Sequence, residues 1–236
     1  MWVLSMSFEK PNNLSCTPIQ IWRGRVGLGF VASLSLLAGM TDAIGFLAIG
    51  NFVSFMSGNT TQLAVAISEG NVDIIFRLSF AVLAFIAGNA LGIMFRNWSG
   101  RQALPLLLLI ALLLFISGLL SVQFMVSSLL IAVLSMGMLN AVVEQLNGSS
   151  VGLTYITGGL SRLGRCLGRS FLGERSPGWS MQLVPWIGML VGAVLGAMLE
   201  ARLDIKAMFF SSGLAVLLGL ISMKIPRDWQ HDYMPS

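Results

Sequence analysis

Six long apolar runs constrain the fold of this chain more than any other feature. Each is close to the ~20 residues that an α-helix needs to cross a bilayer core of about 30 Å. Backbone groups in lipid must hydrogen-bond within the protein, and the runs lack the alternation of a β-barrel. We therefore expect an all-α integral membrane protein with six transmembrane helices. The runs cover roughly residues 26–48, 73–95, 103–121, 122–144, 179–200 and 204–224.

The composition supports a membrane protein and argues against a nucleic-acid partner. Hydrophobic residues make up 56% of the chain and charged residues only 10%, whereas a soluble domain carries about 25% charged residues. The net charge is +4, but the basic residues gather at the ends of apolar runs. Such clusters indicate membrane topology. The two cysteines, Cys16 and Cys166, predict no disulfide framework.

The lysines and arginines predict an orientation, because cytoplasmic loops are enriched in both. With six spans, eleven basic residues fall on one side and three on the other. We therefore expect both termini in the cytoplasm, including the N-terminal segment 1–25 and the tail 225–236. The larger group is Lys10, Arg23, Arg25, Arg96, Arg101, Arg162, Arg165, Arg169, Arg175, Lys224 and Arg227; the smaller is Arg77, Arg202 and Lys206.

A shorter and more polar segment follows the first run of each half. These segments, 57–68 and 157–170, are predicted to be re-entrant or interfacial helices. The chain then divides into two three-span halves, 26–121 and 122–224. Counting the short segments as full spans would move Arg96 and Arg101 to the outer side and spoil the charge pattern.

The two halves resemble each other, which predicts an internal duplication. Gly39, Met40 and Ala43 recur 98 positions later, and Ser57-Gly58 aligns with Thr157-Gly158 at 100. A three-span repeat must invert its topology, and inverted repeats with broken helices are a common plan for secondary transporters. The later matches, also at 100, are Gly88 with Gly188 and Gly92 with Gly192.

These glycines form GxxxG patterns, which let helix backbones approach closely. Gly196 extends the second pattern by one turn. Two interpretations are open: internal helix packing, or the seam of a homodimer.

Three motifs are characteristic: GMTDAIGF, the SGNTTQL that follows and ITGGLSRLG in the second half. In these motifs the chain resembles the YoaK family of uncharacterised bacterial membrane proteins. Ser57 stands where the family typically has threonine. Leu139-Asn140 departs from the family's second-half pattern. The resemblance implies a multi-span protein of the bacterial inner membrane, built around a domain of unknown function, and no established activity.

Asp42 is the first candidate for function. A charged aspartate in the middle of a span costs about 2.5–3.5 kcal/mol on insertion scales, so it usually faces protein or water. It could couple transport to a proton or cation, or bind a substrate amine. The alternative is a structural carboxylate that bonds hydroxyls or caps a broken helix. Its repeat partner is the neutral Asn140, and helix depth favours two half-sites over one shared site.

The break points supply further candidates for a substrate or ion pathway. Ser57 is expected to cap the following helix, and Gly58 permits close backbone approach. Free N–H groups at such a helix start favour anions or carbonyl oxygens, although a capped turn with nothing bound is equally open. The pathway candidates are Asp42, Ser57, Gly58, Asn59, Thr60, Asn140, Thr157 and Gly158.

Three arginines, Arg162, Arg165 and Arg169, share one helical face. They are expected to serve topology and contact anionic headgroups, or alternatively to admit an anionic substrate. Asp73 and Arg77, four residues apart, are expected to form a local pair.

No enzyme, metal or cofactor motif occurs in the sequence, so we expect no enzyme and no cofactor. The leading hypothesis is a secondary transporter or channel-like carrier of an unknown small solute. The alternative is a non-transporting membrane scaffold or sensor that dimerises through its GxxxG faces.

Overall fold

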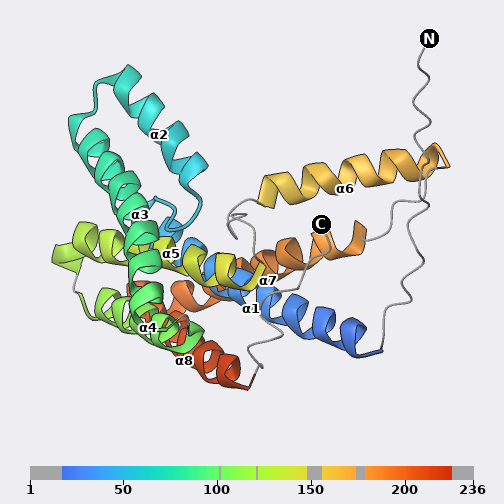
Figure 1. Ribbon diagram of the computed structural model, residues 1–236. Helices are drawn as coiled ribbons and strands as arrows, with labels where there is room; N and C mark the ends of the chain where they lie inside the picture. Colours follow the sequence, from blue (N-terminus) through green and yellow to red (C-terminus); the bar gives the residue numbers. More distant parts are fainter. Residues whose placement is uncertain (1–17, 101, 121, 148–155, 174–178, 225–236) are drawn as a thin grey trace, which may run out of the picture.

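A computed structural model describes residues 18–100, 102–120, 122–147, 156–173 and 179–224 (Figure 1). Throughout these ranges the secondary structure is helical, without a strand. The helices are α1 (Pro18–Ile49), α2 (Met56–Glu69), α3 (Val72–Trp98), α4 (Ala103–Leu119), the short 3-10 helix η1 (Val122–Phe124), α5 (Met125–Asn147), α6 (Ile156–Phe171), α7 (Trp179–Leu203), the 3-10 helix η2 (Asp204–Ala207) and α8 (Met208–Met223).

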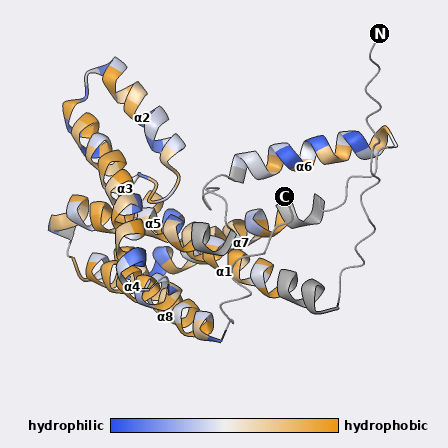
Figure 2. Ribbon diagram, viewed as in Figure 1, coloured by the Kyte–Doolittle hydropathy of each residue, from blue (hydrophilic) through white to orange (hydrophobic). Residues whose placement is uncertain are grey.

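Each apolar run expected from the sequence corresponds to a helix, and the two short segments correspond to α2 and α6. Four stretches of the described chain are long and apolar enough to cross a membrane, and the last of them contains α7, η2 and α8. Helix α4 is a shorter apolar helix of 17 residues. Apolar residues cover most of the bundle in Figure 2. The four stretches are Val26–Ile49, Val72–Trp98, Met125–Val142 and Leu183–Met223.

The helices pack in pairs that join the two halves of the chain. Helix α1 packs mainly on α7, α3 on α5, and α4 on α8. Each short helix packs on the long helix that follows it, α2 on α3 and α6 on α7. In Figure 1, α2 and α3 form a hairpin at one side, while α6 runs above α7 at the other. The buried core lies among α1, α4, α5 and α8 and includes Leu34, Leu37, Leu106, Ile110, Leu129, Met136 and Met208.

Glycines let α1 and α7 touch through their backbones. A methyl group added at Gly192 would collide with the carbonyl oxygen of Leu36, and one at Gly196 with that of Met40. Gly188 meets Ala32 in the same way. The contacts advance together along both helices, so α1 and α7 run parallel.

The same kind of seam joins α3 to α5. A methyl group at Gly88 would collide with the carbonyl oxygen of Leu134, and Gly92 lies against the backbone of Met138. These helices are also parallel. All five GxxxG glycines therefore contact helices of their own chain, as the internal-packing interpretation requires.

The contacts in the two seams suggest a different register for the predicted duplication. Leu36 and Leu134, which are 98 positions apart, contact Gly192 and Gly88 respectively. By contact, Gly88 therefore pairs with Gly192, one helical turn beyond the Gly188 expected from the sequence. In this register residues 88–94 and 192–198 share the pattern Gly-x-x-Leu-Gly-x-Met. Because glycines recur at 188, 192 and 196, the glycine positions alone leave the pairing ambiguous.

Candidate functional site

The candidate site lies where α1 ends and the chain turns into α2. Helix α1 stops at Ile49, and Gly50 adopts a left-handed conformation with φ of 78°. Residues 51–55 then fold back beside the last two turns of α1, which carry Asp42. The side chain of Asp42 is 4% exposed, so the carboxylate is enclosed by protein.

The carboxylate of Asp42 binds the returning chain. Its Oδ1 accepts hydrogen bonds from the backbone N–H groups of Val53 at 2.7 Å, Ser54 at 2.6 Å and Phe55 at 3.4 Å. Its Oδ2 accepts from the Ser54 hydroxyl at 2.5 Å. These donors precede α2, where backbone N–H groups have no helical partner. Asp42 therefore fastens α1 to the start of α2.

A second set of bonds fastens the turn to α2 itself. The side-chain amide of Asn59 accepts from the Phe52 backbone N–H at 2.9 Å and donates to the Phe52 carbonyl at 2.6 Å. Asn59 is fully buried. The Asn51 amide donates to the Gln62 side chain at 2.9 Å. Asparagine suits position 59 because its amide both accepts from the backbone N–H and donates to the backbone carbonyl of the same residue, Phe52.

The expected cap at Ser57 is wrong. Helix α2 begins at Met56 with Phe55 at the N-cap position and no side-chain cap bond. The N–H groups ahead of the helix bond Asp42 instead, so a carboxylate from another helix replaces the local hydroxyl cap. Ser57 and Thr60 are exposed in the first turns of α2.

Gly58 has a packing role beside this turn. A methyl group there would collide with the rings of Phe52 and Phe55 at 2.7–2.8 Å. Phe52 stacks on Phe46 of α1, with ring centroids 4.7 Å apart, and meets Phe55 edge-on at 5.3 Å. Gly58 thus leaves room for the Phe52 and Phe55 rings beside the turn.

The geometry matches the structural alternative for Asp42. Its two oxygens accept four hydrogen bonds from the protein, which leaves no described approach for a ligand. None of the described residues forms a cluster of three or more metal-ligating side chains. Chemically, the Asp42 side chain can hold the connection between α1 and α2. Loss of its charge would release that connection.

The second break point is described in part. Asn140 on α5 donates to the Asn89 side chain of α3 at 3.2 Å, within one helix pair. It does not reach across to another pair as Asp42 does. The turn expected around Asn147–Tyr155 lies mostly outside the described residues. Thr157 is exposed and Gly158 half-buried at the start of α6.

The charged candidates lie apart from Asp42. On α6, Arg162 is half-buried while Arg165 and Arg169 are exposed. The expected pair of Asp73 and Arg77 is not formed: the structure contains no ion pair between them, and the Nε of Arg77 is buried without a hydrogen bond. Near the end of α3, Arg96 Nη1 donates to the Ala141 carbonyl of α5 at 3.5 Å.

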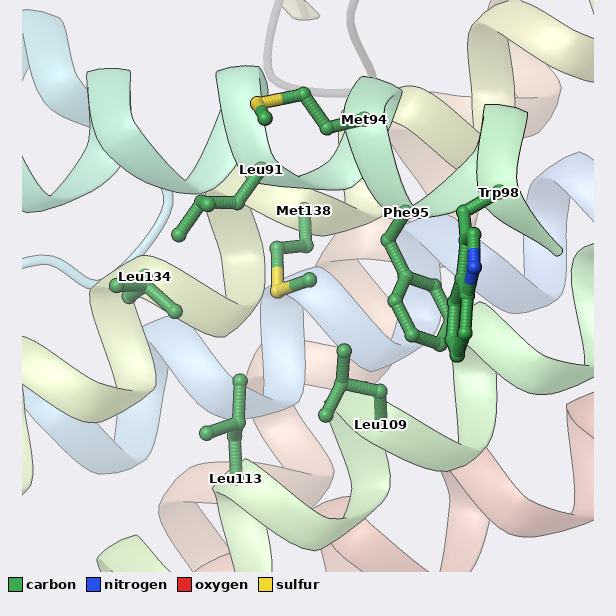
Figure 3. Close-up of a pocket in the computed structure, with 8 residues that line it drawn as sticks. All are labelled: Leu91, Met94, Phe95, Trp98, Leu109, Leu113, Leu134 and Met138. Carbon is green, nitrogen blue, oxygen red and sulfur yellow. The ribbon is translucent and has the colours of Figure 1, made fainter.

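A cavity of about 470 Å³ opens between α3, α4 and α5 (Figure 3). Its lining side chains are almost entirely apolar, with the indole N–H of Trp98 as their polar group, and none belongs to α1 or α2. The cavity therefore lies apart from the Asp42 site. Leu91, Met94, Phe95, Trp98, Leu109, Leu113, Leu134 and Met138 line it.

The apolar helices and the enclosed polar turn define a multi-pass transmembrane protein. The chain belongs to a family described as "Protein of unknown function (DUF1275)", whose model matches residues 30–221. It is also 44% identical over 219 residues to the UPF0700 transmembrane protein RA0705 of Rhizobium meliloti (strain 1021), covering 91% of this chain and 94% of the relative. This is consistent with the resemblance to the YoaK family. No solved structure matches the chain.

Proposed function

We propose that this protein carries a small solute across the bacterial inner membrane, by rearrangement of two inverted three-span halves. Both termini lie in the cytoplasm. The observation that carries the proposal is the correspondence between the two glycine seams. Gly88 on Leu134 and Gly92 on Met138 repeat as Gly192 on Leu36 and Gly196 on Met40.

A further contact obeys the same relation. Gly137 of α5 lies against the Phe85 carbonyl of α3, and Gly39 of α1 lies against the Met189 carbonyl of α7. Three contacts of the α3–α5 seam thus have counterparts in the α1–α7 seam, with the roles of the halves exchanged, and the Gly188–Ala32 contact adds a fourth to the α1–α7 seam. Such a pattern is what a pseudo-two-fold axis between duplicated halves produces, and transporters commonly bind substrate at that interface.

The parallel seams also support six crossings. Because α3 and α5 run in the same direction, the chain must return across the membrane between them, and α4 is the helix available. Polarity separates α2 and α6 from the six crossings: α2 begins with the polar sequence Ser-Gly-Asn-Thr-Thr after Met56, and α6 carries three arginines. The helices α4 and α8, of similar length, contain no charged residue. With α2 and α6 left at the break points, α1 and α5 run in opposite directions and the halves are inverted.

Asp42 acts in this proposal as the coupling residue. Helix α1 belongs to the α1–α7 pair, whereas α2 packs on α3 and so belongs to the α3–α5 pair. The Asp42 bonds therefore tie one pair to the other across the turn 50–55. Protonation would convert Oδ2 from an acceptor to a donor and weaken the acceptor at Oδ1, which loosens that tie.

The enclosed packing of Asp42 favours a second candidate, a non-transporting scaffold or sensor. A carboxylate satisfied by four protein hydrogen bonds needs no solute to explain its presence. A homodimer would have to use a surface other than the GxxxG seams, which are occupied within the chain.

Uptake by the purified protein in proteoliposomes tests the proposal. A broad panel of small solutes is profiled with and without a proton gradient, for wild type and Asp42→Asn. We expect wild type to accumulate at least one solute and Asp42→Asn to lose the response to the gradient. Identical profiles would remove the coupling role of Asp42, and no uptake by wild type would favour the scaffold.

A further inference from the structure

Helix α6 presents two opposite faces of different chemistry. At 100° per residue, Arg162, Arg165 and Arg169 fall within an arc of about 60°. The opposite arc is apolar, and Figure 2 shows hydrophilic and hydrophobic positions alternating along the helix. No acidic residue occurs in α6, so nothing on the helix neutralises its arginines. The apolar arc holds Leu160, Leu163, Leu167 and Phe171.

The bundle covers neither face completely. Helix α6 packs on α7, and its half-buried positions 158, 159, 162, 163 and 166 lie on one side, which includes Arg162 of the basic face and Leu163 of the apolar face. The apolar side chains Leu167 and Phe171 are 44% and 88% exposed, and Leu172, just beyond the helix, is 80% exposed. Arg165 and Arg169 are exposed on the other side. Apolar groups left open beside a basic face are typical of a helix lying in the membrane interface.

Helix α2, the counterpart of α6 in the other half, lacks this basic face. Its sequence from Met56 to Glu69 contains no lysine or arginine. The two helices share a position in the repeat, so the arginines of α6 are not needed to build a break-point helix. They serve something that α6 meets and α2 does not.

We propose that α6 lies in the membrane interface and binds anionic phospholipid headgroups through Arg162, Arg165 and Arg169. Its apolar face enters the acyl-chain boundary while the guanidinium groups contact headgroup phosphates. Arginine suits this partner because its planar fork bonds phosphate oxygens in pairs. The Arg165 Nη1 already donates to the Ser161 hydroxyl at 2.8 Å, which holds that side chain along the basic face and leaves its other donors for a phosphate.

Hydrogen–deuterium exchange of the full-length protein in nanodiscs tests this binding. The nanodiscs contain either phosphatidylcholine alone or phosphatidylcholine mixed with phosphatidylglycerol of the same acyl chains. Each arginine near an anionic surface strengthens attachment roughly fivefold. We therefore expect the exchange rate of α6 amides to be lower in the anionic discs by a factor of about ten or more. High salt should abolish the difference. Amides of α2 should exchange equally in both.

Matched variants assign the effect to the basic face. R165Q/R169Q should lose the protection, and R165K/R169K should keep most of it. The control R202Q/K206Q removes the same charge from two exposed residues outside α6 and should keep it. Exchange at the α1–α7 seam reports that each variant is folded.

Three outcomes would overturn the proposal. Equal α6 exchange in the two kinds of nanodisc would show that α6 does not recognise anionic lipid. Equal loss in R202Q/K206Q would indicate a general charge effect. Protection by inorganic phosphate in phosphatidylcholine discs would indicate a site for a soluble anion instead of a lipid surface.

Discussion

Asp42 and Ser54 are joined twice, by the backbone N–H of Ser54 to Oδ1 at 2.6 Å and by its hydroxyl to Oδ2 at 2.5 Å. Twelve residues separate them in the chain, and the turn between them reverses its direction. The pair fixes the turn that leads from α1 to α2, and α2 packs on α3 of the α3–α5 pair. In the proposed mechanism, a change in one helix pair reaches the other through this turn.

Asp42→Ala should lower the free energy of unfolding by about 3–5 kcal/mol, because buried N–H groups at Val53 and Ser54 lose their acceptor. Asp42→Asn should cost less, since the amide oxygen still accepts. Ser54→Ala removes one hydroxyl bond and should cost about 1–2 kcal/mol. Denaturation in detergent micelles, followed by tryptophan fluorescence, measures the order. An Asp42→Ala variant as stable as wild type would contradict the bonding described.

Asn59→Ala should be destabilised by about 2–3 kcal/mol, because the backbone N–H and the backbone carbonyl of Phe52 both lose a buried partner. The neighbouring Thr60→Ala is the control: its exposed hydroxyl bonds only the Met56 carbonyl of its own helix, so we expect a change within about 0.5 kcal/mol. Amide exchange at Phe52 should accelerate in the first variant alone. Equal effects of the two substitutions would show that the Asn59 pairing does not hold the turn.

Gly88→Ala and Gly192→Ala should each destabilise the protein by about 1–3 kcal/mol, because a methyl group forces backbones apart at the seam. Their effects should be similar, since the two sites are equivalent in the repeat. Gly213→Ala on α8 meets no atom within 4 Å and should be neutral or stabilising by up to about 1 kcal/mol. Thermal unfolding of the three variants in one detergent makes the comparison. If Gly88→Ala lowered the stability while Gly192→Ala left it unchanged, the two positions would not be equivalent.

The two break-point helices should lie on opposite sides of the membrane. Ser57→Cys on α2 and Ser170→Cys on α6 place thiols at exposed positions in a background where Cys16 and Cys166 are serine. A membrane-impermeant maleimide should label position 57 from outside intact cells and position 170 only after permeabilisation. Labelling of both from the same side would rule out inverted halves.

The long helices were predictable from the sequence because a helix that crosses lipid requires a long apolar segment. The two short amphipathic helices α2 and α6 were recognisable by their greater polarity. The role of Asp42 was only half predictable. Its burial follows from its place in an apolar run, but its partners, at positions 53–55, depend on how the chain turns after Gly50. The predicted N-cap role of Ser57 was wrong for that reason, because the carboxylate of Asp42 accepts from the N–H groups ahead of α2 in place of a local hydroxyl.

The register of the predicted repeat was ambiguous from the glycines alone. Gly188, Gly192 and Gly196 recur every four residues, so a shift of one turn leaves as many glycines matched. The backbone contacts of Leu36 and Leu134 distinguish the alignments, and the shared Leu and Met of residues 88–94 and 192–198 agree with them. The charge difference between α2 and α6 was visible from the start, but the uncovered apolar side of α6 required the structure.

In the proposed mechanism, the hydrogen bonds between Asp42 of α1 and residues 53–55 of the turn must open during transport. Gly45→Cys/Val53→Cys can lock it, because a Cβ at Gly45 would lie 3.7 Å from the Cβ of Val53, within the usual range for a disulfide. The measurement is proteoliposome uptake of a solute that wild type accumulates, before and after reduction, in the background without Cys16 and Cys166. The oxidised variant should be folded and inactive, and reduction should restore uptake, while each single cysteine variant stays active. Full uptake by the oxidised, cross-linked protein would contradict the account.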